Sequence, residues 1–235
     1  MVKLFRSTLG PAMLKDCLDS ISSQTQKPTI VYVVDQSDNT ETFEVCKNYD
    51  VEYYHKEFKN KSKAVNFGIS IAKTSHISII DDDTILYSDW VESSINTFRM
   101  YKNILITQGQ IIAGKNQTGN KVSRNNDVIK KRYYIKKGWI TPIFKIGCNF
   151  IFSKSIIEKV GLFDDSFGPG AIFRGAHDTE WGYRVLRAGF IVLFEPNIKL
   201  IHQSWRNKEE DLKQMTGYGF AAGAFLAKAK KKIYT

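Results

Sequence analysis

The sequence lacks several features that would place it in other classes of protein. No apolar run approaches the about 18 residues that a membrane-spanning helix needs, and no signal-peptide pattern opens the chain. The three cysteines, Cys17, Cys46 and Cys148, are odd in number and widely spaced. This spacing excludes a disulfide framework or a cysteine zinc motif and favours a reducing compartment, so we expect a cytoplasmic protein. No G-x-G-x-x-G follows a predicted strand, which excludes a Rossmann dehydrogenase.

The composition is that of a globular protein with an excess of positive charge. Hydrophobic residues make up 43% of the 235 positions, and the formal net charge is +10 at pH 7. Such a charge favours an anionic partner, which would be a phosphorylated substrate, a nucleic acid or an acidic lipid. Two basic clusters, at 130–137 and 228–232, carry much of the excess. The alternative for both clusters is an ordinary solvated face.

Hydrophobic periodicity predicts alternating strands and helices in the first half of the chain. The expected strands are 30–34, 51–54 and 76–80, and the expected helices are 13–23, 40–48, 62–72 and 88–101. This alternation is typical of an α/β fold with a parallel sheet and right-handed crossovers.

The second half of the chain has a different pattern. We expect a polar loop at 113–127, an apolar strand at 146–152, and a short helix capped by Ser153 and ended by Gly161. A helix at 178–188, strands at 190–194 and 198–201 on either side of Pro196, and a terminal helix at 212–232 follow. No repeat or linker divides the sequence, so we predict one domain over 1–235.

Three consecutive carboxylates, Asp81, Asp82 and Asp83, directly follow the expected strand at 76–80. Adjacent charges at the end of a buried strand are costly unless something compensates them. Mg²⁺ takes carboxylate ligands together with substrate phosphates, and open α/β sheets bind ligands at the carboxyl ends of their strands. The triplet therefore predicts a metal–phosphate site, and the alternative is a solvated acidic turn.

Five other polar residues are candidates for the same site. Asp35 ends a strand and could bind a nucleobase or ribose, or could belong to a turn. Lys63 and Asn66 are three residues apart and could face one ligand, or could be ordinary surface residues. Asp178 is at the start of an expected helix, where it is either a functional carboxylate or a simple N-cap residue. His202 ends the last strand, where it either completes a metal shell or has a structural role.

In their order and spacing these motifs resemble the family 2 glycosyltransferases of the GT-A fold, over nearly the whole chain. The segment 81-DDD-83 matches the DxD metal motif of that family. Other similar segments are the first helix with Gln24 at its end, 33-VVDQS-37, 63-KAVNFGI-69, 147-GCNFIF-152, 160-VGLFD-164 and 177-HDTE-180. Each motif is weak alone, and together they are specific.

The resemblance implies a GT-A type α/β fold, with a Rossmann-like, mostly parallel sheet flanked by helices and a smaller mixed sheet on the acceptor side. Residues 1–112 would form the nucleotide-sugar-binding half, 113–205 the acceptor and catalytic half, and 206–235 a C-terminal helical tail. The implied activity is inverting, metal-dependent transfer of a hexosyl or related sugar from a nucleotide-diphosphate sugar to an acceptor hydroxyl. Surface polysaccharide or glycolipid synthesis is the implied setting.

The resemblance also implies roles for individual residues. Asp178 would be the catalytic base, and Asp83, Asp81 and His202 would hold Mn²⁺ or Mg²⁺. The expected nucleotide-sugar contacts are Thr8, Asp35, Lys63, Asn66, Asp81 and Asp82. The expected acceptor-side residues are Gly147, Asn149, His177 and Glu180. The acceptor would be a glycan or a lipid-linked sugar, and the basic, partly apolar tail at 220–232 could lie on the anionic inner face of the membrane.

The sequence departs from the family pattern at two places. His177 replaces a usual glutamate, and the first strand, at 2–8, carries lysine and arginine where the family is apolar. The first departure favours an alternative, a catalytically inactive sugar- or nucleotide-binding module of the same fold, although the retained carboxylates oppose it. A second alternative, a basic nucleic-acid-binding protein, lacks any recognisable motif, so we expect no nucleic-acid partner.

Overall fold

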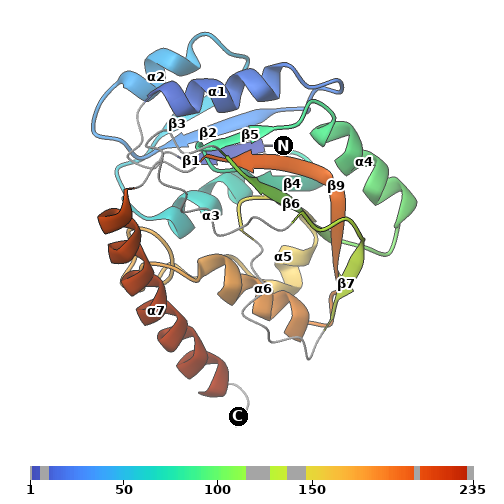
Figure 1. The fold of residues 1–235 in the computed structure, drawn as a ribbon, viewed down its shortest axis with the longest axis vertical. Helices are drawn as coiled ribbons and strands as arrows, with labels where there is room; N and C mark the ends of the chain where they lie inside the picture. The colour runs from blue at the N-terminus through green and yellow to red at the C-terminus, as the bar shows by residue number, and fades with distance from the viewer. Residues whose placement is uncertain (1, 6–10, 115–127, 137–146, 204–206, 232–235) are drawn as a thin grey trace.

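The computed structural model describes residues 2–5, 11–114, 128–136, 147–203 and 207–231. In this part of the chain, helices cover both faces of one sheet (Figure 1). The helices are α1 (Pro11–Ser22), α2 (Glu41–Cys46), α3 (Lys61–Ile71), α4 (Trp90–Met100), α5 (Ile156–Val160), α6 (His177–Arg187) and α7 (Lys208–Lys231). The strands are β1 (Val2–Phe5), β2 (Val31–Asp35), β3 (Glu52–His55), β4 (His76–Ile79), β5 (Thr84–Leu86), β6 (Ile106–Ala113), β7 (Tyr133–Ile135), β8 (Phe150–Ser153) and β9 (Val192–His202).

The sheet has the strand order β3-β2-β1-β4-β8-β6-β9-β5, with β7 beside β9. Strands β1 to β4 pair in parallel, which confirms the predicted α/β class for the first half. Beyond β4 the sheet is mixed, because β8 is antiparallel to both β4 and β6 while β6 is parallel to β9. The mixed part is therefore continuous with the parallel part in a single sheet.

Two apolar clusters lie on opposite faces of the sheet. On one face, Leu14, Cys17, Leu18 and Ile21 of α1 are buried with the first turn of α4. Their spacing is that of a helix with one apolar face, as predicted. On the other face, α3, α5 and α6 cover the strands around the buried Trp181, whose ring stacks on a phenylalanine of the preceding loop at 4.8 Å. Figure 1 shows α1 and α2 on one side of the sheet and α3, α5 and α6 on the other.

Some predicted details of the second half are wrong. The two strands expected around Pro196 are one strand, β9, because the pairing with β6 shifts register between Gly109 and Gln110. A register shift removes the need for a ladder hydrogen bond from proline. Ser153 ends β8, and Ser155 is the N-cap residue of α5. Strands β5 and β6 of the first half and β7 of the second half were not predicted, and parts of the expected loop at 113–127 and of the basic cluster at 130–137 lie outside the described residues.

The terminal helix α7 is docked onto α6 and the loop before it. Phe225 packs edge-on against Tyr183 of α6, with ring centroids 5.4 Å apart. The Lys228 ammonium lies 2.6 Å from the buried Glu180 carboxylate and 2.5 Å from Asp164. A charged hydrogen bond to a buried carboxylate contributes about 1.5–3 kcal/mol. The helix is thus held by both apolar packing and ion pairs along this side of the domain (Figure 1).

Candidate active site

The acidic triplet and His202 meet because β5 runs antiparallel to β9. In this pairing Thr84 lies opposite His202, the last residue of β9. The His202 Nε2 atom is 3.4 Å from Asp83 Oδ1, and Asp83 is 5% exposed. The sheet therefore brings the predicted metal ligands Asp83 and His202 together from distant parts of the sequence. Asp82, the middle residue of the triplet, is buried.

Lys61 is a site residue that the sequence reasoning missed. Its ammonium lies 2.6 Å from Asp81 Oδ1, and the two side chains are 18% and 19% exposed. Burial by itself would raise the pKa of Asp81, but the positive charge of Lys61 and the hydrogen bond from its ammonium lower that pKa below its usual value. Burial likewise opposes charge on Lys61, but Asp81 and Asp83 raise the pKa of its ammonium. Both groups are therefore charged at neutral pH.

Lys63, the lysine predicted for the site, lies on the exposed side of α3. Its backbone N–H donates to the side chain of the N-cap residue Asn60. Residues two apart on a helix do not face the same way, so only one of Lys61 and Lys63 can point toward the triplet. The sequence offers no signal that identifies Lys61.

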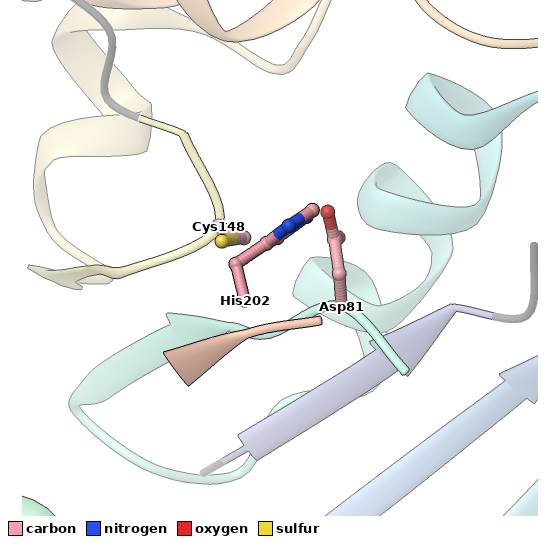
Figure 2. A group of neighbouring side chains, drawn as sticks. All are labelled: Asp81, Cys148 and His202. Atoms are coloured by element: carbon pink, nitrogen blue, oxygen red, sulfur yellow. The ribbon is translucent and has the colours of Figure 1, made fainter. Parts of the chain in front are cut away.

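A third group, the Cys148 thiol, completes a compact cluster. The Asp81 carboxylate, the Cys148 Sγ and a His202 ring nitrogen all lie within 4.8 Å of one another. Figure 2 shows the three side chains converging from β9, from the segment before β8 and from the turn after β4. Cys148 is 7% exposed, and burial together with the charges of Asp81 and Asp83 raises the pKa of its thiol well above the usual value.

Asp178 lies in the first turn of α6 and contacts the segment that carries Cys148. Its Oδ1 accepts a hydrogen bond from the Thr179 backbone N–H at 2.8 Å, and its Oδ2 accepts one from the Gly147 N–H at 3.2 Å. Gly147 has φ +55°, a left-handed conformation that glycine adopts without strain. The predicted base is thus fixed beside the residue that precedes Cys148.

His177, which replaces the usual glutamate of the family pattern, is mostly buried next to Asp178. Its Nδ1 is 4.0 Å from Asp178 Oδ1. Burial and the charge of Lys61 lower the pKa of the imidazole, although Asp178 and Asp81 oppose that change. The imidazole is therefore neutral at neutral pH, and the position carries no charge.

Asp35 is fully buried at the end of β2 and already has hydrogen-bond donors around it. Its carboxylate accepts from the Ser37 N–H at 2.9 Å, from the Ser37 hydroxyl at 2.8 Å and from the Tyr53 hydroxyl at 2.8 Å. This arrangement fixes the carboxylate at the edge where the parallel strands end, in the position predicted for nucleoside binding.

Three other predicted site residues hold elements of the fold together. Asn66 bonds to both the N–H and the C=O of Phe163, which ties α3 to the loop before α6. Asn149 donates to two backbone carbonyls and accepts from the Trp90 indole. Glu180 is buried and bonds to Arg184 and Lys228. Their substrate contacts stay predictions, and Thr8 lies outside the described residues.

The fold and these motifs define a class of protein, the GT-A glycosyltransferases, and comparisons with known proteins give the family. A family model described as "Glycosyl transferase family 2" matches residues 5–161. The chain belongs to this family and is a glycosyltransferase, as the sequence predicted. An uncharacterised glycosyltransferase of Rickettsia typhi is 24% identical over 95% of this chain and 70% of its own length. A chondroitin synthase of Pasteurella multocida is 24% identical over 84% of this chain and 24% of its own length.

Solved structures show the same fold. A fragment of S. aureus TarS, residues 1–349, in complex with UDP has a TM-score of 0.66 and 13% identity over 92% of this chain. GalNAc-T7 with UDP, GalNAc and Mn²⁺ has a TM-score of 0.63 and 15% identity over 87% of this chain. These likenesses confirm the predicted GT-A fold. The chain spans 64% of the TarS fragment and 44% of GalNAc-T7, so it corresponds to only part of either.

Proposed function

We propose that the protein is an inverting, metal-dependent glycosyltransferase that moves a hexosyl or related sugar from a nucleotide-diphosphate sugar to an acceptor hydroxyl. The observation that carries this proposal is the cluster of Asp81, Asp83 and His202 at the sheet edge, with Asp178 fixed beside it through Gly147. The solved TarS structures that contain UDP and UDP-GlcNAc support a nucleotide-sugar donor. The likeness to a chondroitin synthase supports a role in polysaccharide synthesis.

The donor set of the cluster fits a divalent cation such as Mn²⁺ or Mg²⁺. Carboxylates are the ligands that such ions prefer, imidazole binds many divalent ions, and Asp83, Asp81 and His202 would hold the ion. When bound, it would neutralise charge on the leaving diphosphate. Lys61 is paired with Asp81 in this structure. We infer that its ammonium would serve a donor phosphate oxygen when an ion takes the carboxylate.

The other chain residues would bind and orient the two substrates. The proposed donor contacts are Asp35, Lys63, Asn66, Asp82 and Thr8, and the proposed acceptor-side residues are Gly147, Asn149, His177 and Glu180. Asp178 would accept the proton of the acceptor hydroxyl as that oxygen attacks the anomeric carbon. A single displacement from the face opposite the leaving group inverts the anomeric configuration.

The proposal predicts metal-dependent binding and turnover of one class of nucleotide sugar. The test is a thermal-shift panel of nucleotide sugars with and without Mn²⁺ or Mg²⁺, followed by measurement of nucleoside diphosphate release in the presence of mixed glycan acceptors. We expect one nucleotide to raise the melting temperature, more so with the ion, and its sugar to be transferred. Stable binding with no turnover on any acceptor would support the inactive binding module. No stabilisation by any nucleotide sugar would contradict both.

We also propose that α7 lies on the anionic inner face of the membrane. In the part of the chain that the structure describes, no helix is long and apolar enough to cross a bilayer. Phe220 and Leu226 of α7 are 63% and 57% exposed, and Lys230 is also exposed. Lys228 forms ion pairs with Glu180 and Asp164, so we do not expect it to contact lipid. An exposed lysine near anionic lipid contributes about 1 kcal/mol.

A double substitution, Phe220→Ser with Leu226→Ser, is expected to weaken binding to anionic vesicles several-fold at low salt, because both exposed apolar side chains are removed. Leu162→Ser, a change at an exposed leucine outside α7, is the matched control and should bind like the unmodified chain. Co-sedimentation with phosphatidylglycerol vesicles measures the difference. Equal recovery of all three proteins in the supernatant would show that α7 is not a membrane contact.

A further inference from the structure

We propose that Cys148 is a direct ligand of the divalent cation, so that this site prefers thiophilic ions such as Zn²⁺, Cd²⁺ or Co²⁺ to Mg²⁺. This inference rests on the proposed function, because it concerns the same ion. It adds a sulfur donor to the two carboxylates and the imidazole.

The distances carry the inference. The donor atoms of Asp81, Cys148 and His202 are all within 4.8 Å of one another. Ions of this kind bind sulfur at about 2.3 Å and nitrogen or oxygen at about 2.0–2.2 Å, so two ligands of one ion lie roughly 3–4 Å apart. Figure 2 shows the His202 ring beside the Asp81 carboxylate with the Cys148 side chain close to His202, and side-chain rotations would bring all three into contact with one ion.

The charges of the site also fit a bound thiolate. Asp81, Asp82, Asp83 and a Cys148 thiolate would carry four negative charges, and Lys61 carries one positive charge. A divalent cation would therefore offset most of the negative charge of this buried group. The cation would draw the proton from the thiol and release it to solvent, as metal binding to cysteine requires. Thiolate is a soft ligand that favours Zn²⁺ and related ions, whereas Mg²⁺ takes oxygen ligands.

The other cysteine near the triplet has a different environment. Cys17 is fully buried, and its Sγ lies 3.7 Å from the backbone oxygen of Asp81 and 3.8 Å from the Thr84 hydroxyl. Its thiol is thus directed at the backbone and a hydroxyl, and Cys46 is a buried residue at the end of α2, near Asp35. Cys17 and Cys46 are therefore internal controls for Cys148.

The experiment is a Co²⁺ titration of the full chain. The readout is the near-ultraviolet charge-transfer absorption that only a sulfur–cobalt bond produces. The variant Cys17→Ser with Cys46→Ser leaves Cys148 as the only cysteine. We expect the band in the unmodified chain and in this double variant, and its loss in Cys148→Ser. We also expect Zn²⁺ affinity to fall at least about 10-fold in Cys148→Ser, with Mg²⁺ affinity nearly unchanged.

The outcomes separate this inference from the proposed function. If calorimetry shows that Co²⁺ binds the unmodified chain but no sulfur–cobalt band develops, Cys148 is not a ligand and the proposed function stands. If the band is lost in the double variant, the sulfur comes from another cysteine and the inference is overturned. If no divalent ion binds even with UDP present, the metal role fails together with the inference. If Cys148→Ser does not fold, the double variant still tests the inference, because Cys148 is its only cysteine.

Discussion

Replacing Asp178 with asparagine is expected to lower sugar transfer by roughly 10²-fold or more while donor binding is retained. Asparagine keeps the shape of the side chain and can still accept from the Thr179 N–H through its amide oxygen. It cannot take the proton of an acceptor hydroxyl. The hydrogen bond from the Gly147 N–H, at 3.2 Å, is lost in the variant, and retained donor binding would show that the site keeps its shape without it. Initial transfer rates and donor affinity, measured on the same preparation, check this result.

The matched control is Asp50→Asn, a change at an exposed residue between α2 and β3, which should leave both quantities unchanged. Near-normal transfer by Asp178→Asn would show that another group is the base. Glu180 would then be the next acid to test. Its carboxylate is 2% exposed and bonded to Arg184 and Lys228, so it would first have to leave those partners.

Replacing Asp83 with alanine is expected to abolish turnover and to remove the part of nucleotide affinity that depends on the metal. Asp83 lies 3.4 Å from His202 in a buried position, where its carboxylate would be a principal metal ligand. Without the Asp83 carboxylate, the ion would lose one ligand and the negative charge that balances part of its own. Calorimetric titration of UDP with Mn²⁺, repeated with excess chelator, measures the metal-dependent part. The unmodified chain should show a large difference and the variant almost none.

Asp50→Ala is the control for this experiment, and Asp83→Asn is a second variant that keeps the volume of the buried side chain. Circular dichroism of each variant establishes that the fold is retained. If the unmodified chain binds UDP equally well with and without chelator, the ion has no part in nucleotide binding and the metal role of the triplet is wrong.

The alternation of elements in the first half was predictable because it depends on local burial. A helix such as α1 hides one face, so its apolar residues recur every three to four positions and can be read along the chain. Buried parallel strands such as β2 and β4 appear as short apolar runs for the same reason. Asp35 and Asp81 could therefore be identified as strand-end carboxylates, because each comes at the end of such an apolar run.

The mixed half of the sheet was less predictable because strand pairing is not local. Strand β5 has only three residues, and its pairing with β9 depends on the whole path of the chain between them. Pro196 suggested a break in a strand, but a shift in register lets β9 continue past it. A short apolar segment does not indicate which partner it will pair with, or in which direction.

The sequence by itself determined the α/β class, the family and the strand-end carboxylates, because repeated burial and a characteristic order of motifs are properties of the chain. Only the tertiary structure decided which side chains meet. It selected Lys61 over Lys63 as the partner of Asp81 and placed the Cys148 thiol beside Asp81 and His202. It also placed Asn149 and Glu180 in internal hydrogen bonds. Each of these contacts depends on strand order, register and helix rotation, which fix distances between residues far apart in the sequence.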